Sequence, residues 1–151
     1  MLPKYHIIIG SVASITIHFL FNLTLLQTSL IFLSSILIDI DHYLLFIIKE
    51  KNLSLKKAYK WFHERRRKWL VLNKNEKKWY KHSLFIFHGI EFFILLIILA
   101  NHINLIWFVL IGITIHMVLD YIEIFKNRDP FYTKFSQIMV LIKNKNKKDF
   151  G

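Results

Sequence analysis

The sequence predicts an all-α protein: an integral membrane four-helix bundle with a basic, amphipathic cytoplasmic loop between the second and third spans. Hydrophobic residues make up 54% of the 151 residues, more than the ~45–50% that is usual in soluble chains. They are concentrated in two blocks, residues 5–38 and 92–119, which contain no Asp, Glu, Lys or Arg. Because a span needs about 20 mostly apolar residues, each block has room for one crossing and part of a second.

We expect the spans over residues 5–21, 25–48, 83–100 and 103–125. Short polar segments at 22–24 and 101–104 separate the members of each pair, as is usual in antiparallel helical hairpins. These elements form a single transmembrane domain over residues 1–126. Residues 127–151 form a basic C-terminal tail rich in Lys and Asn, which we expect to be disordered.

The positive charges lie on one side of this arrangement. One of the 21 Lys and Arg residues precedes the first span, thirteen lie in the loop at 49–82, and seven follow residue 125. The positive-inside rule then predicts a multi-pass protein of the cell membrane with both termini in the cytoplasm. The net charge of +11 indicates contact with the lipid bilayer and its anionic headgroups, and we expect no nucleic-acid partner.

The basic loop interleaves aromatic rings with cations. Trp61, Phe62 and Trp69 alternate with Lys and Arg residues, which is typical of one or two helices lying in the membrane interface. Such a loop is most often a membrane anchor. A sharper hypothesis is that a run of four cations helps to bind an anionic substrate headgroup. The run consists of Arg65, Arg66, Arg67 and Lys68.

Three of the predicted spans contain an acidic residue and a histidine at helical spacing. A charge at the centre of a span costs roughly 2.5–3.5 kcal/mol, so buried acids normally face a bundle interior and serve a function. Residues three or four apart share one helix face. The pairs are Asp39 with His42, His88 with Glu91, and His116 with Asp120.

The three pairs are also predicted to lie at the same depth in the membrane. Counting about 1.5 Å per residue from the cytoplasmic end of each span places all six in one layer. Three imidazoles and three carboxylates suit one or two divalent ions such as Zn, Mn or Fe. We therefore predict a metal site and not a set of His–acid pairs that only join helices. The predicted ligands are Asp39, His42, His88, His116 and Asp120.

Other residues could complete the site. Glu91 or Asp41 could act as a general base, although Asp41 points about 200° away from Asp39 on a regular helix. It can share the ion only where that helix is distorted. His6 and His82 are possible additional ligands, because they lie at the predicted cytoplasmic ends of the first and third spans. The chain has no Cys, which excludes Cys-ligated zinc, iron–sulfur clusters and disulfides.

Several short motifs resemble a known family. The segments ILIDIDH at 36–42 and HMVLD at 116–120 resemble the membrane-bound metal-dependent hydrolases, the YdjM-like small inner-membrane proteins. HGIE at 88–91 is similar to a prokaryotic sub-branch, and KHS at 81–83 is similar to the family's Thr-His-Ser motif. This resemblance implies a metal and hydrolase activity.

Three functions are compatible with these features. The first is a metal-dependent hydrolase that acts on a lipid or phosphoester at the cytoplasmic interface through a metal-activated water. The second is a lipid oxidase or desaturase of the di-iron type, since such proteins place His and carboxylate ligands in a helical bundle. The third is a metal-ion or proton transporter, formed by a homo-oligomer and with no enzymatic activity.

Overall fold

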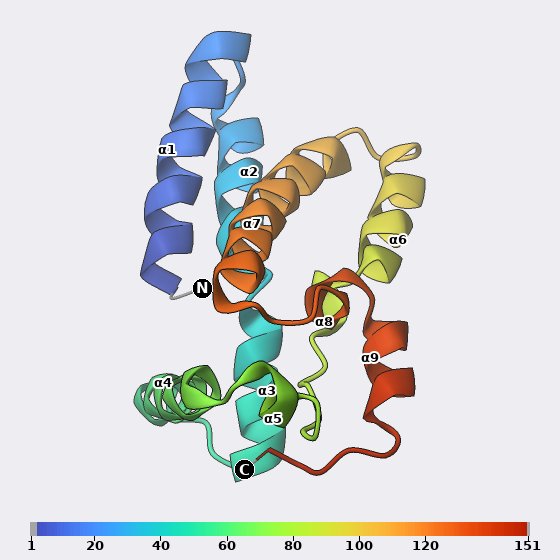
Figure 1. The fold of residues 1–151 in the computed structure, drawn as a ribbon. Coiled ribbons are helices and arrows are strands. Elements are labelled where there is room, and N and C mark those ends of the chain that lie inside the picture. The colour runs from blue at the N-terminus through green and yellow to red at the C-terminus, as the bar shows by residue number, and fades with distance from the viewer. Residues whose placement is uncertain (1–2, 151) are drawn as a thin grey trace.

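The computed structural model describes residues 3–150, in which every regular element is a helix (Figure 1). The prediction of an all-α protein is therefore confirmed. The elements are α1 (Pro3–Phe21), α2 (Leu25–Leu37), α3 (Ile40–Glu50), α4 (Leu55–Val71), α5 (Lys74–Lys77), the 3₁₀ helix η1 (Ile86–His88), α6 (Ile90–Ala100), α7 (Ile106–Asn127), α8 (Tyr132–Phe135) and α9 (Gln137–Asn144).

Among the described residues, three helices are long and apolar enough to cross a membrane. They cover Lys4–Phe21, Leu25–Glu50 and Ile106–Asn127, the second being α2 and α3 together. Large apolar side chains such as Ile8 and Phe19 are exposed on their outer faces, as expected where lipid replaces water. The fold thus agrees with three of the four predicted spans in length and composition.

Helix α2 packs against both α1 and α7. A glycine makes the close approach of α7 possible, because a Cβ at Gly112 would overlap Ser34 Oγ and the carbonyl oxygen of Ile31. His116 lies one turn beyond Gly112 on α7. The same close packing therefore brings His116 against α2.

The second predicted span is broken where its acids lie. Helix α2 ends at Leu37 and α3 begins at Ile40. At the break the Asp39 N–H donates to Ile36 O and the His42 N–H donates to Asp39 O. Each of these hydrogen bonds joins residues three apart, as in a 3₁₀ helix, and not four apart as in an α-helix. This local distortion is the condition under which Asp39 and Asp41 can face the same cluster.

The third predicted span, over residues 83–100, is not one continuous helix. Helix α6 has 11 residues, or about 16 Å at 1.5 Å per residue, against a hydrocarbon core of about 30 Å. An irregular segment precedes it, and protein side chains accept its backbone N–H groups. Phe85 N–H donates to Gln137 Oε1, and Phe87 N–H donates to Asp41 Oδ2. Non-helical backbone is tolerated at membrane depth only where the protein supplies such partners.

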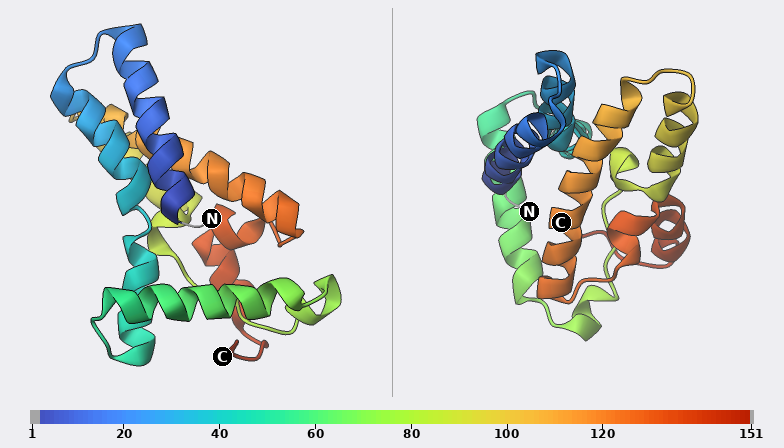
Figure 2. Two further views of the ribbon diagram at one scale, coloured as in Figure 1. Left: turned by 90° about the vertical axis from the view of Figure 1, so that its left-hand side faces the viewer. Right: turned by 90° about the horizontal axis from the view of Figure 1, so that it is seen from above.

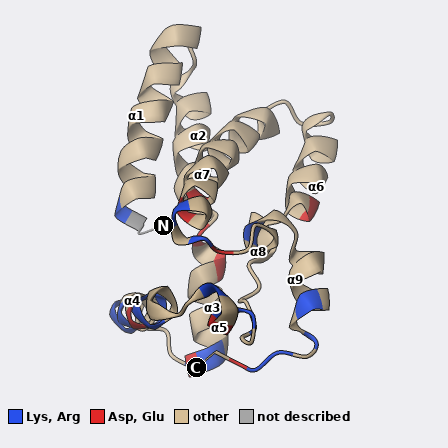
Figure 3. Cartoon of the chain, in the orientation of Figure 1, with Lys and Arg blue, Asp and Glu red and all other residues tan. Residues whose placement is uncertain are grey.

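The charged residues gather at one end of the molecule. Lys and Arg lie on α4, at the end of α3, along the C-terminal segment and at the start of α1, whereas the two hairpin loops at the opposite end carry none (Figure 3). Helix α4 contacts α3 and crosses it at a steep angle (Figure 2). This one-sided charge distribution agrees with the pattern read from the sequence.

The C-terminal segment folds back onto the protein, which differs from the expected disorder. Helices α8 and α9 lie below α6 and α7 (Figure 1). Further on, Lys81 N–H donates to Lys148 O at 2.8 Å, and Lys148 N–H donates to Trp79 O at 2.9 Å. Composition alone predicted disorder because it contains no information about these distant partners.

Candidate metal centre

Four side chains from three separate elements meet at one point inside the protein. His88 comes from η1, His116 and Asp120 come from α7, and Asp39 comes from the break between α2 and α3. The two Nε2 atoms lie 3.2 Å apart. Asp120 Oδ2 lies 3.4 and 3.2 Å from the Nε2 atoms of His88 and His116, and Asp39 Oδ1 lies 3.4 and 3.5 Å from them. We call these four residues the core ligand set.

The separation of the two Nε2 atoms, and the distances from each carboxylate oxygen to both of them, match the edges of a tetrahedral metal's coordination shell. Ligand atoms about 2.0–2.1 Å from zinc are separated by about 3.3–3.4 Å along each edge of the tetrahedron. Five of the six separations within the core ligand set, those that involve an Nε2 atom, run from 3.2 to 3.5 Å. The set also suits Mn and Fe, which accept imidazole and carboxylate ligands.

The remaining ring nitrogens of the two buried histidines are also bonded. His88 Nδ1 lies 2.9 Å from Asp41 Oδ2, and His116 Nδ1 lies 2.8 Å from the backbone oxygen of Ser35. A carboxylate and a carbonyl only accept hydrogen bonds, so each Nδ1 donates and each neutral ring presents the Nε2 lone pair to the centre. Metal-binding histidines are typically oriented in this way.

Asp41 and His42 flank the core ligand set. Asp41 Oδ1 lies 2.8 Å from His42 Nδ1, so one carboxylate joins two imidazoles, those of His42 and His88. His42 Nδ1 also lies 3.4 Å from Asp39 Oδ1. Its side chain is 26% exposed, whereas those of His88 and His116 are fully buried. His42 is therefore the more accessible of these three imidazoles.

His6 on α1 also reaches the cluster. Its ring stacks on that of His116 with centroids 3.9 Å apart, and its Nε2 lies 3.7 Å from Asp120 Oδ1. Within residues 3–150 neither ring nitrogen has a hydrogen-bond partner, although both are buried. The groups that could hold a metal ion are His6–Asp39–His116, Asp39–His42–His88 and His88–His116–Asp120.

Glu91 lies apart from the other acids. It accepts hydrogen bonds from Ser136 Oγ at 2.6 Å and from the N–H groups of Gln137 and Ile138 at 3.2 Å, so it caps the N-terminus of α9. The expected shared helix face with His88 does not form, because α6 begins only at Ile90. The structure thus does not bring Glu91 to the centre.

His82 is also distant from the centre and lies in the wall of a cavity. Its ring packs edge-on against Trp69 and Tyr132. Burial, together with the nearby Lys147 and Lys77, lowers its pKa to about 4. Asn144 bonds both its backbone N–H and its carbonyl. These contacts make His82 part of the docking site for the C-terminal segment.

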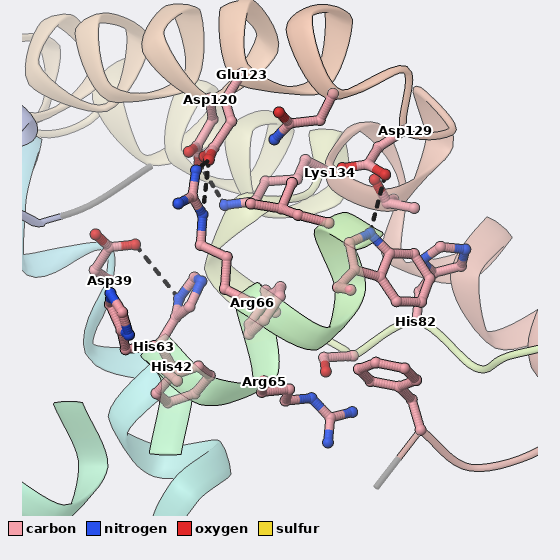
Figure 4. Close-up of a pocket in the computed structure, with 18 of the residues that line it drawn as sticks. Asp39, His42, His63, Arg65, Arg66, His82, Asp120, Glu123, Asp129 and Lys134 are labelled. Atoms are coloured by element: carbon pink, nitrogen blue, oxygen red, sulfur yellow. Dashed lines mark hydrogen bonds and ion pairs between the residues drawn. The ribbon is translucent and has the colours of Figure 1, made fainter. Parts of the chain in front are cut away.

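A cavity of about 460 Å³ opens beside the centre, between α3, α4, the end of α7 and the C-terminal segment (Figure 4). Asp39, His42 and Asp120 line its inner end. Of the four predicted headgroup cations, Arg65 and Arg66 line the cavity. Arg66 forms an ion pair with Glu123, and the Arg65 guanidinium lies 5.1 Å above the Trp61 ring and 5.2 Å above the Phe150 ring.

The other two predicted headgroup cations face outward. Arg67 and Lys68 are exposed on α4 and do not line the cavity. Residues within one turn of α4 therefore differ in position: Arg65 and Arg66 line the cavity, whereas Arg67 and Lys68 lie on the surface. The sequence pattern of four adjacent cations could not distinguish these positions.

Lys134 is the main residue that sequence reasoning missed. Its Nζ lies 2.6 Å from Asp120 Oδ2, and it lines the same cavity (Figure 4). Burial alone would lower its pKa, but the carboxylates of Asp120 and Asp39 raise that pKa above its ordinary value. Lys134 is therefore a cation at the edge of the centre. No spacing rule connects it with Asp120, because the chain reverses direction between α7 and α8.

Comparisons with protein-family models, curated proteins and solved structures found no match for this chain. The resemblance to the YdjM-like hydrolases therefore stays a prediction.

Proposed function

We propose that this chain is an integral membrane, metal-dependent hydrolase that acts on a lipid phosphoester at the cytoplasmic membrane interface. The observation that carries this proposal is the core ligand set. Two buried Nε2 atoms lie 3.2 Å apart, each of two carboxylate oxygens lies 3.2–3.5 Å from both of them, and the opposite nitrogen of each imidazole is bonded.

Charge balance supports one divalent ion. Asp39, Asp41 and Asp120 contribute three negative charges, and Lys134 contributes one positive charge. One divalent ion makes the group neutral, which removes most of the cost of burying these acids. Such an ion would lower the pKa of a water molecule toward neutrality and so supply a nucleophile.

The chain's own residues then position and move the proton. Asp41 fixes the rings of His42 and His88, and the more exposed His42 is placed to accept a proton from the attacking water. The water oxygen forms a bond to phosphorus, the ester P–O bond breaks, and the proton passes from His42 to the departing oxygen. The products are an alcohol and a phosphate group, so atoms and charge balance.

The membrane placement follows from the charges. We propose four passages, with the irregular segment and α6 forming a shortened third one, and with both termini in the cytoplasm. Helix α4 lies at the charged end beside the cavity (Figure 3). Arg67 and Lys68 then bind anionic headgroups of the surrounding bilayer, while Arg65 and Arg66 face the substrate.

The hydrolase proposal is favoured over a di-iron oxidase by the contacts of Glu91. Di-iron bundles use four carboxylates with two histidines, and here Glu91 instead caps α9. Bound iron with an oxo-bridge absorption would support the oxidase, and liposome flux that depends on Asp39 would support the transporter.

The decisive experiment combines elemental analysis with a hydrolysis assay. Detergent-purified protein is assayed for metal, and for phosphate release from phosphatidic acid in mixed micelles with Zn, Mn or Fe. We expect His116→Ala to lose both the metal and the activity, and His102→Ala, in an exposed hinge, to keep both. Bound metal without phosphate release from any lipid phosphoester would refute the hydrolase proposal.

A further inference from the structure

Lys134 lies on the boundary between the core ligand set and the cavity. Its Nζ is 2.6 Å from Asp120 Oδ2, the oxygen that is also 3.2 Å from His116 Nε2. The same Nζ lies 5.5 Å from the centroid of the Phe85 ring, and both residues line the cavity. The ammonium group therefore contacts a predicted metal ligand and faces the space where a substrate would lie.

A bound ion changes what this ammonium group can contact. A divalent ion that shares Asp120 Oδ2 repels the ammonium, because two cations then compete for one oxygen. Rotation of the long, flexible lysine side chain toward the cavity relieves this repulsion when an anion is present there. Lys134 is thus suited to bind an anionic group directly beside the ion.

The rest of the cavity wall indicates what carries that anionic group. Its volume of about 460 Å³ lies within the roughly 300–1,000 Å³ of small-molecule sites, which are mainly apolar with a few polar groups. Here Asp39, His42, Asp120 and Lys134 line the side next to the centre, and further polar residues such as Arg65 and His82 line the rest of the wall. The apolar part of the wall includes Leu55, Phe62, Leu70, Trp69, Ile124 and Phe150.

We propose that Lys134 binds the phosphoryl oxygens of an amphiphilic phosphomonoester whose hydrocarbon chain lies along this apolar wall. The inference rests on the proposed function and names the substrate class of the same site. It makes Lys134 the residue that selects anionic over neutral amphiphiles.

The test measures equilibrium binding and so does not depend on turnover. Zinc-loaded protein is titrated with dodecyl phosphate and with dodecanol, and zinc affinity is measured by chelator competition. We expect Lys134→Met to weaken dodecyl phosphate binding about tenfold or more, to leave dodecanol binding unchanged, and to bind zinc about tenfold more tightly, because a neighbouring cation is removed. A purely structural role of Lys134 would not change the two affinities in opposite directions.

Lys145→Met is the matched control, because Lys145 is an exposed lysine of the same segment. This variant should bind zinc, dodecyl phosphate and dodecanol as the wild type does. Retained zinc shows that a variant is folded. Lys134→Gln, which keeps a hydrogen-bond donor near Asp120, replaces Lys134→Met if the latter loses zinc.

Equal dodecyl phosphate affinity in the Lys134 and Lys145 variants would overturn the role of Lys134 and leave the metal site intact. A wild-type protein that binds no zinc, manganese or iron would overturn the proposed function and this inference together. Tight dodecyl phosphate binding with no hydrolysis would overturn the hydrolase activity alone.

Discussion

The Nε2 atoms of His88 and His116 lie 3.2 Å apart in the buried interior, and the Nδ1 atom of each ring is held by an acceptor. In neutral rings this arrangement directs two lone pairs at each other. The contact is favourable only with a positive charge between or beside the two nitrogen atoms. Two carboxylates at 3.2–3.5 Å complete a group whose chemistry is that of a cation site.

Asp41 should tune the metal affinity without being a ligand. Asp41→Asn leaves one acceptor oxygen where two imidazoles are now held, so one of the rings loses its orientation. We expect zinc to bind about 10–100-fold more weakly, the usual effect of removing a hydrogen-bond partner of a metal ligand. The measurement is competition with a chromophoric chelator. Asp149→Asn, at an exposed position, is the control, and equal affinities in the two variants would count against the role of Asp41.

Glu91 should stabilise the C-terminal segment and not the metal. Glu91→Gln weakens three hydrogen bonds to the start of α9, and hydrogen bonds to a charged group contribute about 1.5–3 kcal/mol each. We expect faster amide hydrogen exchange across α9 with unchanged metal content. Glu64→Gln, on the exposed face of α4, should change neither. Loss of metal from Glu91→Gln with no change in exchange would mean that Glu91 acts at the centre.

His82 should make the docking of the C-terminal segment sensitive to acid. Its pKa falls from 6.5 to about 4 in the folded protein, so the unfolded chain binds more protons between these values. The stability from neutral His82 is therefore complete above pH 6.5 and is lost as the pH falls toward 4.

The test compares thermal unfolding of the wild type and His82→Phe at pH 7.5 and 5.0. Phe keeps the ring contacts with Trp69 and Tyr132 but does not titrate. We expect the unfolding temperature to fall less in His82→Phe than in the wild type. Equal falls in the two proteins would assign the acid sensitivity to other groups.

The proposed topology can be tested by labelling, because the chain has no Cys. Single cysteines at Leu25 and His102 report on the two hairpin loops, and cysteines at Lys68 and Lys145 report on the charged end. We expect an impermeant maleimide added to intact cells to label only the first two. Labelling of the cysteine at Lys145 but not of the one at His102 would show that α6 does not carry the chain across the membrane.

Much of the fold could be predicted from apolar blocks and charge placement. The blocks correctly indicated α1, the α2–α3 segment and α7, because a span requires length and composition above all. Helical spacing also paired His116 with Asp120, and the structure places Asp39 and His88 beside them. These residues were predictable because ionisable side chains are rare in apolar spans and normally face the interior of a helical bundle.

The remaining features depend on contacts between distant segments, which periodicity does not record. The start of α6 at Ile90 separates Glu91 from His88, and side chains from Asp41 and Gln137 replace the missing helical hydrogen bonds. Lys134 reaches Asp120 only because the chain reverses after α7. A basic, Asn-rich composition suggested disorder in that region, and no local pattern indicated the reversal.

Metal analysis of the purified protein tests the central claim most directly. The core ligand set predicts about one equivalent of a divalent metal per chain, lost in both His88→Ala and His116→Ala and retained in His102→Ala. Thermal unfolding with and without a chelator should show that the bound metal stabilises the wild type and not the two ligand variants. A wild-type protein free of metal after purification and reconstitution, or ligand variants with unchanged metal content, would contradict the account.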